Sequence, residues 1–68
     1  MAHYCVNKNA QDNGDHEVHV VGCTYYPAEK NRLPLGDHNS CGPAVTKANE
    51  TYKKSNGCFY CCKPCHTT

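Results

Sequence analysis

The strongest constraint on this chain is a cysteine-rich stretch near its C-terminus, residues 57–66, which reads GCFYCCKPCH. It holds four of the seven cysteines in the 68-residue sequence, arranged as two adjacent Cys-x-x-Cys pairs, Cys58/Cys61 and Cys62/Cys65. Clustered cysteines at such spacings are typical of metal sites and of disulfide frameworks. We therefore expect this stretch to cross-link the fold.

The apolar content is too small to hold a fold of this size without cross-links. Leucine, isoleucine, valine and phenylalanine together account for eight of 68 residues, a share typical of disordered chains. Disorder also needs a high net charge, whereas this chain carries only +1. A core in so small a domain supplies about 3–5 kcal/mol. We therefore expect one small domain over residues 1–68, stabilised in part through its cysteines.

The expected cellular compartment favours metal over disulfides. Residues 1–5 (MAHYC) lack the basic and apolar regions of a signal peptide, and no run approaches the roughly 20 apolar residues of a membrane span. We therefore expect a cytoplasmic protein without a membrane partner. In a reducing cytoplasm, clustered cysteines bind metal more often than they pair with one another.

The cysteine spacing predicts a structural zinc site. Such a site takes four cysteine or histidine ligands, and a Cys-x-x-Cys turn commonly supplies two of them. Cys61 and Cys62 are neighbours and cannot easily face one ion together, so one of them, Cys62, is expected to be spare. The remaining ligands would come from isolated upstream cysteines, or from His66. The predicted ligand pool is Cys23, Cys41, Cys58, Cys61 and Cys65, one more than a single ion needs.

The N-terminal half predicts an antiparallel pair of strands. Residues 3–8 alternate weakly and residues 15–21 (DHEVHVV) alternate more clearly, while residues 9–14 (NAQDNG) are rich in turn formers. The face of the second strand expected to look inward carries His16, Val18 and Val20. His19 is therefore expected on the outward face.

One helix is predicted, over residues 41–54. Its apolar positions repeat at helical spacing and form one stripe, Cys41, Ala44, Val45, Ala48 and Tyr52. Gly57 is expected to follow in a left-handed conformation. Before the helix, residues 32–36 predict a short strand at a sheet edge, because Pro34 cannot donate a ladder hydrogen bond. The prediction is an α+β fold, a hairpin or three-stranded sheet packed on one helix, with a cysteine-rich tail returning along it.

Two other uses of the cysteines stay open. Disulfides, such as Cys23 with Cys41 or one of these with the tail, would also stabilise the chain, since closing a loop of about 15 residues contributes about 3 kcal/mol. Residues 62–65 (CKPC) and 41–44 (CGPA) are similar to dithiol redox motifs. Ala44 replaces the second cysteine in the latter, and no βαβ pattern surrounds either motif.

The sequence points away from catalysis. It lacks Gly-x-Ser-x-Gly, His-Glu-x-x-His and phosphate-loop motifs, and residues 15–19 (DHEVH) suit the polar start of a strand as well as they suit a metal. A cluster near the tail could contact a nucleic acid or be a solvated helix end, Lys53, Lys54, Phe59, Tyr60, Lys63 and His66. We predict a non-enzymatic, zinc-stapled module that binds a protein or a nucleic acid, with no evident small-molecule substrate. The alternatives are a disulfide-stapled interaction protein and, behind it, a thiol oxidoreductase.

The chain resembles a group of small bacterial proteins without an assigned activity. The resemblance rests above all on Asn13–His19 (NGDHEVH) and on the tail pattern Gly57-Cys58-x-x-Cys61-x-x-x-Cys65-His66-Thr67, and it spans nearly the whole chain. It implies a shared fold rather than a function. In that pattern Cys5 and Cys62 are the dispensable cysteines.

Overall fold

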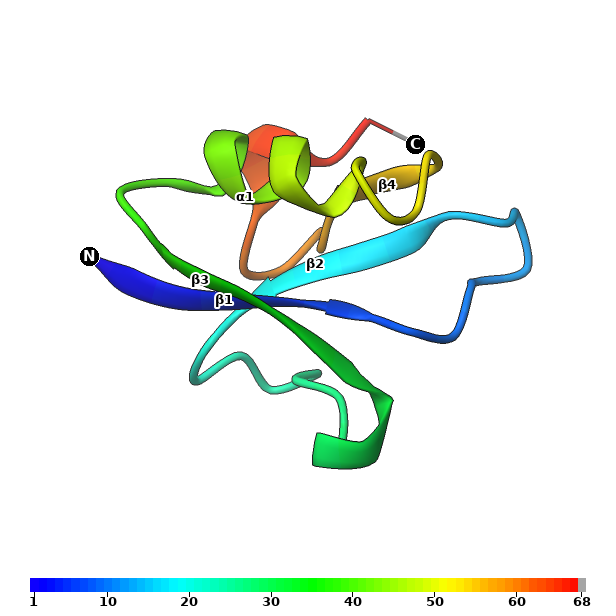
Figure 1. The fold of residues 1–68 in the computed structure, drawn as a ribbon, viewed down its shortest axis with the longest axis horizontal. Coiled ribbons are helices and arrows are strands. Elements are labelled where there is room, and N and C mark those ends of the chain that lie inside the picture. Colours follow the sequence, from blue (N-terminus) through cyan, green and yellow to red (C-terminus); the bar gives the residue numbers. More distant parts are fainter. Residues whose placement is uncertain (68) are drawn as a thin grey trace.

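The computed structural model describes residues 1–67 as an α+β fold, in which a four-stranded mixed sheet packs against one helix (Figure 1). The strands are β1 (Ala2–Asn7), β2 (His16–Val20), β3 (Arg32–His38) and β4 (Ser55–Gly57); the helix α1 is Cys41–Ala48, and the short 3-10 helices η1 and η2 are Glu29–Asn31 and Lys63–Cys65. The predicted fold class is confirmed. The last residue of the predicted domain lies outside the described range. No helix within that range has both the length and the apolar character needed to cross a bilayer.

The sheet is built around β1, in the order β3-β1-β2-β4. β1 pairs antiparallel with both neighbours, and the turn that joins it to β2 contains Gly14 at φ +89°, a conformation that glycine adopts without strain. Pro34 lies on the edge strand β3, as predicted. The β1–β3 register shifts between Tyr4 and Cys5, which pair with Gly36 and Pro34 respectively.

The core lies between one face of the sheet and α1. It combines the inward residues of the strands with the apolar stripe of the helix and one tail residue, Tyr4, Val6, Val18, Leu35, Cys41, Ala44, Ala48 and Cys62. The predicted helical stripe is confirmed from Cys41 to Ala48, with Val45 partly buried, and Tyr52, beyond the end of the helix, also packs partly buried against this cluster. The predicted helix end at residue 54 is wrong. The helix ends at Ala48, and the Asn49 side chain accepts a hydrogen bond from the Ser55 N–H at 3.2 Å in the turn that follows.

β4 is a strand that the sequence analysis missed. Its three residues pair parallel with β2, and Gly57 faces Val18. The prediction of a left-handed Gly57 is wrong, since its φ is not positive. Glycine is needed there for space. A Cβ at this position would lie 2.5 Å from the carbonyl oxygen of Cys62 and 2.8 Å from Cβ of Cys65.

A disulfide bond joins the tail to the helix. It links Cys41, the first residue of α1, to Cys65, the last residue of η2. This is the predicted return of the tail toward the helix start, closed here by a covalent bond between residues 24 positions apart.

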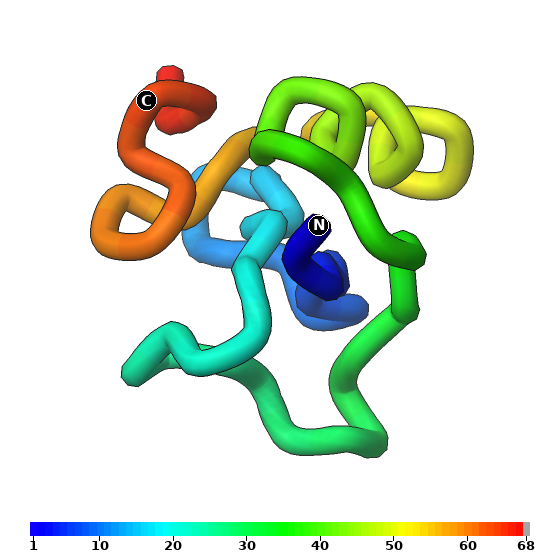
Figure 2. The backbone as a smooth tube through the Cα atoms, turned by 90° about the vertical axis from the view of Figure 1, so that its left-hand side faces the viewer, coloured from blue at the N-terminus to red at the C-terminus, as the bar shows by residue number. Residues whose placement is uncertain are grey.

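The segment 21–31 lies on the other side of the sheet from α1. Figure 2 shows it leaving the end of β2, swinging away from the sheet and returning to it at β3. The two faces of the sheet are therefore covered differently, one by a helix and the other by an irregular segment.

Replacement of Gly57 by alanine should destabilise the fold by about 1–3 kcal/mol or more, because the added methyl group meets backbone rather than a flexible side chain. Chemical unfolding followed by circular dichroism measures the loss. Gly42→Ala is the matched control, since its nearest neighbour, Ser40 Oγ, is 3.9 Å away and alanine is the better helix former. Equal unfolding midpoints for the two variants would contradict the packing argument.

Candidate metal site

Four side chains converge at the end of β2 and can hold a metal ion. They are His19, Cys23, Cys58 and Cys61, and one ligand atom from each lies within 4.8 Å of the others. His19 and Cys58 are each 1% exposed, whereas Cys23 and Cys61 are partly exposed. The cluster therefore combines a neutral nitrogen donor with three sulfur donors at a half-buried position.

The strand pairing places two of these ligands side by side. Because Val18 pairs with Gly57, the next residues along the parallel strands, His19 and Cys58, become neighbours. The Cys58 N–H also donates to the Val18 carbonyl oxygen at 2.9 Å, which fixes the chain as it leaves β4.

Two tight turns bring in the other two ligands. After β2, the Cys23 N–H donates to the Val20 carbonyl at 3.1 Å and turns the chain back toward the strand. After β4, the Cys62 N–H donates to the Cys58 carbonyl at 2.9 Å, which curls the Cys-x-x-Cys loop so that Cys61 faces the same point.

Each of the three sulfur atoms accepts a backbone N–H. The donors are Tyr25 to Cys23, Tyr60 to Cys58 and Val20 to Cys61, each with a nitrogen–sulfur distance of 3.4 Å. Hydrogen bonds to a charged acceptor stabilise the charged form. This arrangement therefore suits thiolates, the form in which cysteine binds metal.

The two ring nitrogens of His19 have different surroundings. Nδ1 lies 3.9 Å from Cys61 Sγ, whereas Nε2 lies 3.5 Å from the Glu17 carboxylate. A carboxylate on the far nitrogen favours the tautomer whose near nitrogen can bind a metal. Burial lowers the pKa of His19, although Glu17 opposes the shift, and this burial favours the neutral form that binds metal.

The distances suit a tetrahedral ion. Metal–sulfur bonds of ≈ 2.3 Å at tetrahedral angles place sulfur atoms about 3.8 Å apart, and the Sγ atoms of Cys23 and Cys58 are 4.0 Å apart. Burial raises the pKa of the Cys61 thiol, and the neighbouring sulfurs add to the rise. A cation at the centre removes this penalty, because its charge favours the thiolates.

The predicted ligand pool divides into two groups. Cys23, Cys58 and Cys61 meet in the cluster, whereas Cys41 and Cys65 are bonded to each other and offer no thiolate while that bond is intact. The alternative ligand His66 contacts the Gly57 carbonyl oxygen through Nδ1 at 3.1 Å and is not among the four.

The two cysteines expected to be spare are not among the four, although Cys62 Sγ lies 3.8 Å from Cys61 Sγ. Cys5 and Cys62 are buried, and both keep free thiols. Cys62 packs in the core between sheet and helix.

His19 is the candidate ligand that the sequence analysis missed. The alternation of the strand correctly separates it from Val18, but the predicted outward face is covered by the Cys58–Cys61 loop. One signal was available in the sequence. His19 and Cys23 are four residues apart, a close ligand pair that complements the pair Cys58/Cys61.

The loops that carry the cysteines also carry exposed aromatic rings. Tyr25, Phe59 and Tyr60 are exposed, and the Tyr25 and Tyr60 rings lie 4.7 Å apart between centroids. Phe59 packs edge-on against Tyr60, and Lys63 Nζ lies 5.3 Å from the centre of the Phe59 ring. We call Tyr25, Phe59 and Tyr60 the aromatic cluster.

Comparisons of this chain with protein-family models, with curated proteins and with solved structures found no match. The chemistry of the site is therefore argued from its own ligand atoms.

Replacement of His19 by glutamine should weaken Co²⁺ binding by at least about 100-fold, since even groups outside the ligand shell are worth 10–100-fold. Titration of the chain with Co²⁺, followed through the thiolate-to-cobalt absorption band, measures the affinity. His66→Gln is the control, because His66 lies outside the cluster and should leave the affinity unchanged. Equal loss in both variants would mean that His19 acts only through folding.

Proposed function

We propose that this chain is a small, non-enzymatic binding module whose fold is held by one structural zinc ion on His19, Cys23, Cys58 and Cys61. The observation that carries the proposal is the convergence of four ligand atoms within 4.8 Å. All four positions of a tetrahedral ion are then filled by protein, as in structural rather than catalytic zinc sites.

Energetics support a structural role for the ion. The described core contains few large apolar side chains, and three of its eight buried members are small or sulfur-bearing residues of α1. Zinc binding supplies roughly 10–16 kcal/mol in small domains, well above the few kcal/mol expected of such a core. The ion would join the end of β2 to the loop after β4, the region where the sheet has its shortest strand.

The disulfide-stapled alternative is supported by the Cys41–Cys65 bond. Under the entropic account, a bond that closes a loop of this length stabilises the fold by about 3.5 kcal/mol. The two cross-links are compatible, since they share no sulfur atom. We therefore propose that both contribute, with zinc as the larger contributor.

A combined measurement of metal and thiols tests this proposal. Native mass spectrometry of the chain should show one zinc per molecule, and chelation should unfold the protein. Thiol counting after chelation, in denaturant without reductant, should give five free thiols, the five unpaired cysteines of the structure. A folded protein without metal would refute the zinc site, and seven free thiols would refute the disulfide.

A thiol oxidoreductase receives less support. Burial raises the pKa of Cys62, the first cysteine of the CKPC segment, and Cys65, the second, is bonded to Cys41 instead. A reactive dithiol needs an accessible cysteine with a lowered pKa.

The aromatic cluster supports a protein partner rather than a nucleic acid. Tyrosine and phenylalanine are enriched in protein interfaces, and the zinc site would hold both loops that carry them. Nucleic-acid affinity depends chiefly on cations that contact phosphates. Lys63 is the one lysine or arginine of the described residues shown in contact with a ring of this cluster, and the whole chain carries only +1.

The choice of partner class can be tested without knowing the partner. A ten-nucleotide single-stranded DNA or RNA, titrated into the zinc-loaded chain at about physiological salt, should leave the amide resonances of residues 23–26 and 58–63 unshifted. Saturable shifts in these residues that weaken as salt increases would instead favour a nucleic acid.

A further inference from the structure

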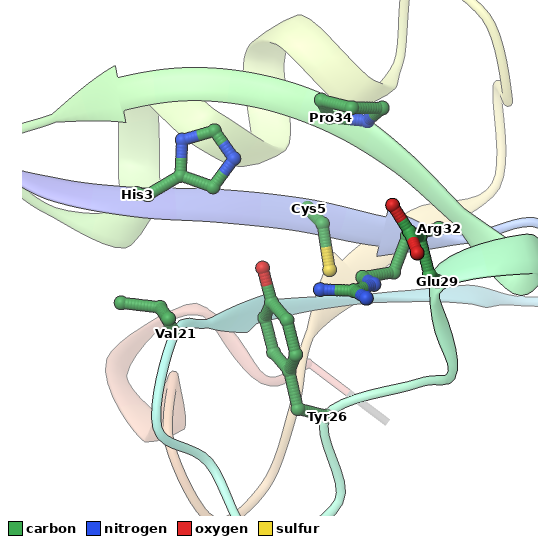
Figure 3. A pocket seen from close by; sticks show the side chains of 7 residues that line it. All are labelled: His3, Cys5, Val21, Tyr26, Glu29, Arg32 and Pro34. Atoms are coloured by element: carbon green, nitrogen blue, oxygen red, sulfur yellow. The ribbon is translucent and has the colours of Figure 1, made fainter.

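A pocket of about 240 Å³ lies on the face of the sheet away from α1 (Figure 3). It is bounded by β1, by the start of β3 and by the segment 21–31. It borders the proposed zinc site, because Cys5 pairs with His19 across β1 and β2 and Cys23 lies near the start of that segment. The lining residues are His3, Cys5, Val21, Tyr26, Glu29, Arg32 and Pro34.

The pocket has a buried floor and a more open rim. Cys5 is 1% exposed and forms the floor, with its sulfur pointing into the space, while Tyr26 and Arg32 are partly buried and form the walls (Figure 3). Val21 and Pro34, at the rim, are exposed. Most of this lining is apolar, which suits an organic ligand.

Arg32 brings a positive charge into the pocket. Its guanidinium lies over the Tyr26 ring, with Cζ 4.9 Å from the ring centre, and reaches toward the sulfur of Cys5 (Figure 3). Within residues 1–67 no carboxylate forms an ion pair with it, and its enclosed Nε has no hydrogen-bond partner there. The stacking on Tyr26 therefore positions the cation without neutralising it.

The other ionisable groups of the pocket do not supply the missing negative charge. His3 pairs with Asp37 at 3.1 Å, so that carboxylate is already engaged. Cys5 is 1% exposed at the floor of the pocket, and burial disfavours a charged thiolate there. Glu29 is exposed at the rim and forms no ion pair with Arg32.

The size and charge of the pocket define its ligand. A protein cavity of about 150 Å³ can hold benzene, so 240 Å³ has room for a ring or short aliphatic body with one polar group. A single guanidinium matches a singly charged, planar carboxylate in bidentate geometry. A doubly charged phosphate ester would meet only one unpaired cation and would lie near the Glu29 carboxylate.

We propose that this pocket binds a small organic carboxylate, whose charged group pairs with Arg32 while its apolar part packs against Tyr26, Val21 and Pro34. This activity goes beyond the structural zinc site and does not depend on the aromatic cluster.

Benzoate is a suitable probe, and benzamide is its uncharged match. Each is titrated into the folded full chain, with whatever metal it carries when purified, and amide shifts of residues 3–5 and 26–34 are followed by NMR. Benzoate should shift these residues saturably and bind at least tenfold more tightly than benzamide. Arg32→Gln should remove that difference, whereas Lys30→Gln, which removes an exposed charge from the same segment outside the pocket lining, should preserve it.

The ligand comparison keeps the proposal testable even where Arg32→Gln disturbs folding. Equal binding of benzoate and benzamide to the unmodified chain would overturn it, as would an absence of shifts in the pocket. Tighter binding of benzylammonium than of benzoate would also overturn it, because Glu29 would then govern recognition. Failure of the zinc measurement with a positive benzoate result would leave this proposal standing.

Discussion

The parallel pairing of β4 with β2 is the contact on which the rest of the structure depends. It aligns Gly57 with Val18, and in consequence Cys58 emerges beside His19. The same pairing brings the tail so close that Cys62 and Cys65 pack directly over Gly57. A strand of three residues could not hold this position through three backbone pairings alone. The proposed zinc ion and the Cys41–Cys65 bond fix the chain that follows it, one at each end of the returning tail.

The seven cysteines divide into different physical roles. Three converge with His19 in a polar cluster where backbone N–H groups meet every sulfur. Two form a covalent bond between helix and tail. Cys62 fills space in the core, and Cys5 forms the floor of the pocket. In so small a domain, cysteine therefore serves as cross-link, ligand and compact apolar side chain at once.

The segment 21–31 links the proposed zinc site to the proposed ligand pocket. Successive residues of β1 point to opposite sides, so Tyr4 and Val6 pack toward α1 while His3 and Cys5 line the pocket. The segment 21–31 carries Cys23 at one end and leads into Arg32 at the other, with Tyr26 between them. An ion at Cys23 would hold one end of the pocket wall in place. The same ion would then stabilise both the fold and the wall of the proposed ligand pocket.

Features that follow from local periodicity and chain geometry could be predicted from the sequence. The apolar stripe of α1, the edge position of Pro34, the turn at Gly14 and the Cys58/Cys61 half of the cluster could all be read from neighbouring residues. The remaining features depend on contacts between residues far apart in the chain. Strand β4 is too short to show an alternating pattern in the sequence. It forms because β2, about 40 residues away, offers a pairing partner. Alternation showed which way His19 points, but not that the Cys58–Cys61 loop covers that side. The long-range pairing of β4 with β2 places His19, rather than Cys41, beside the cysteines of that loop.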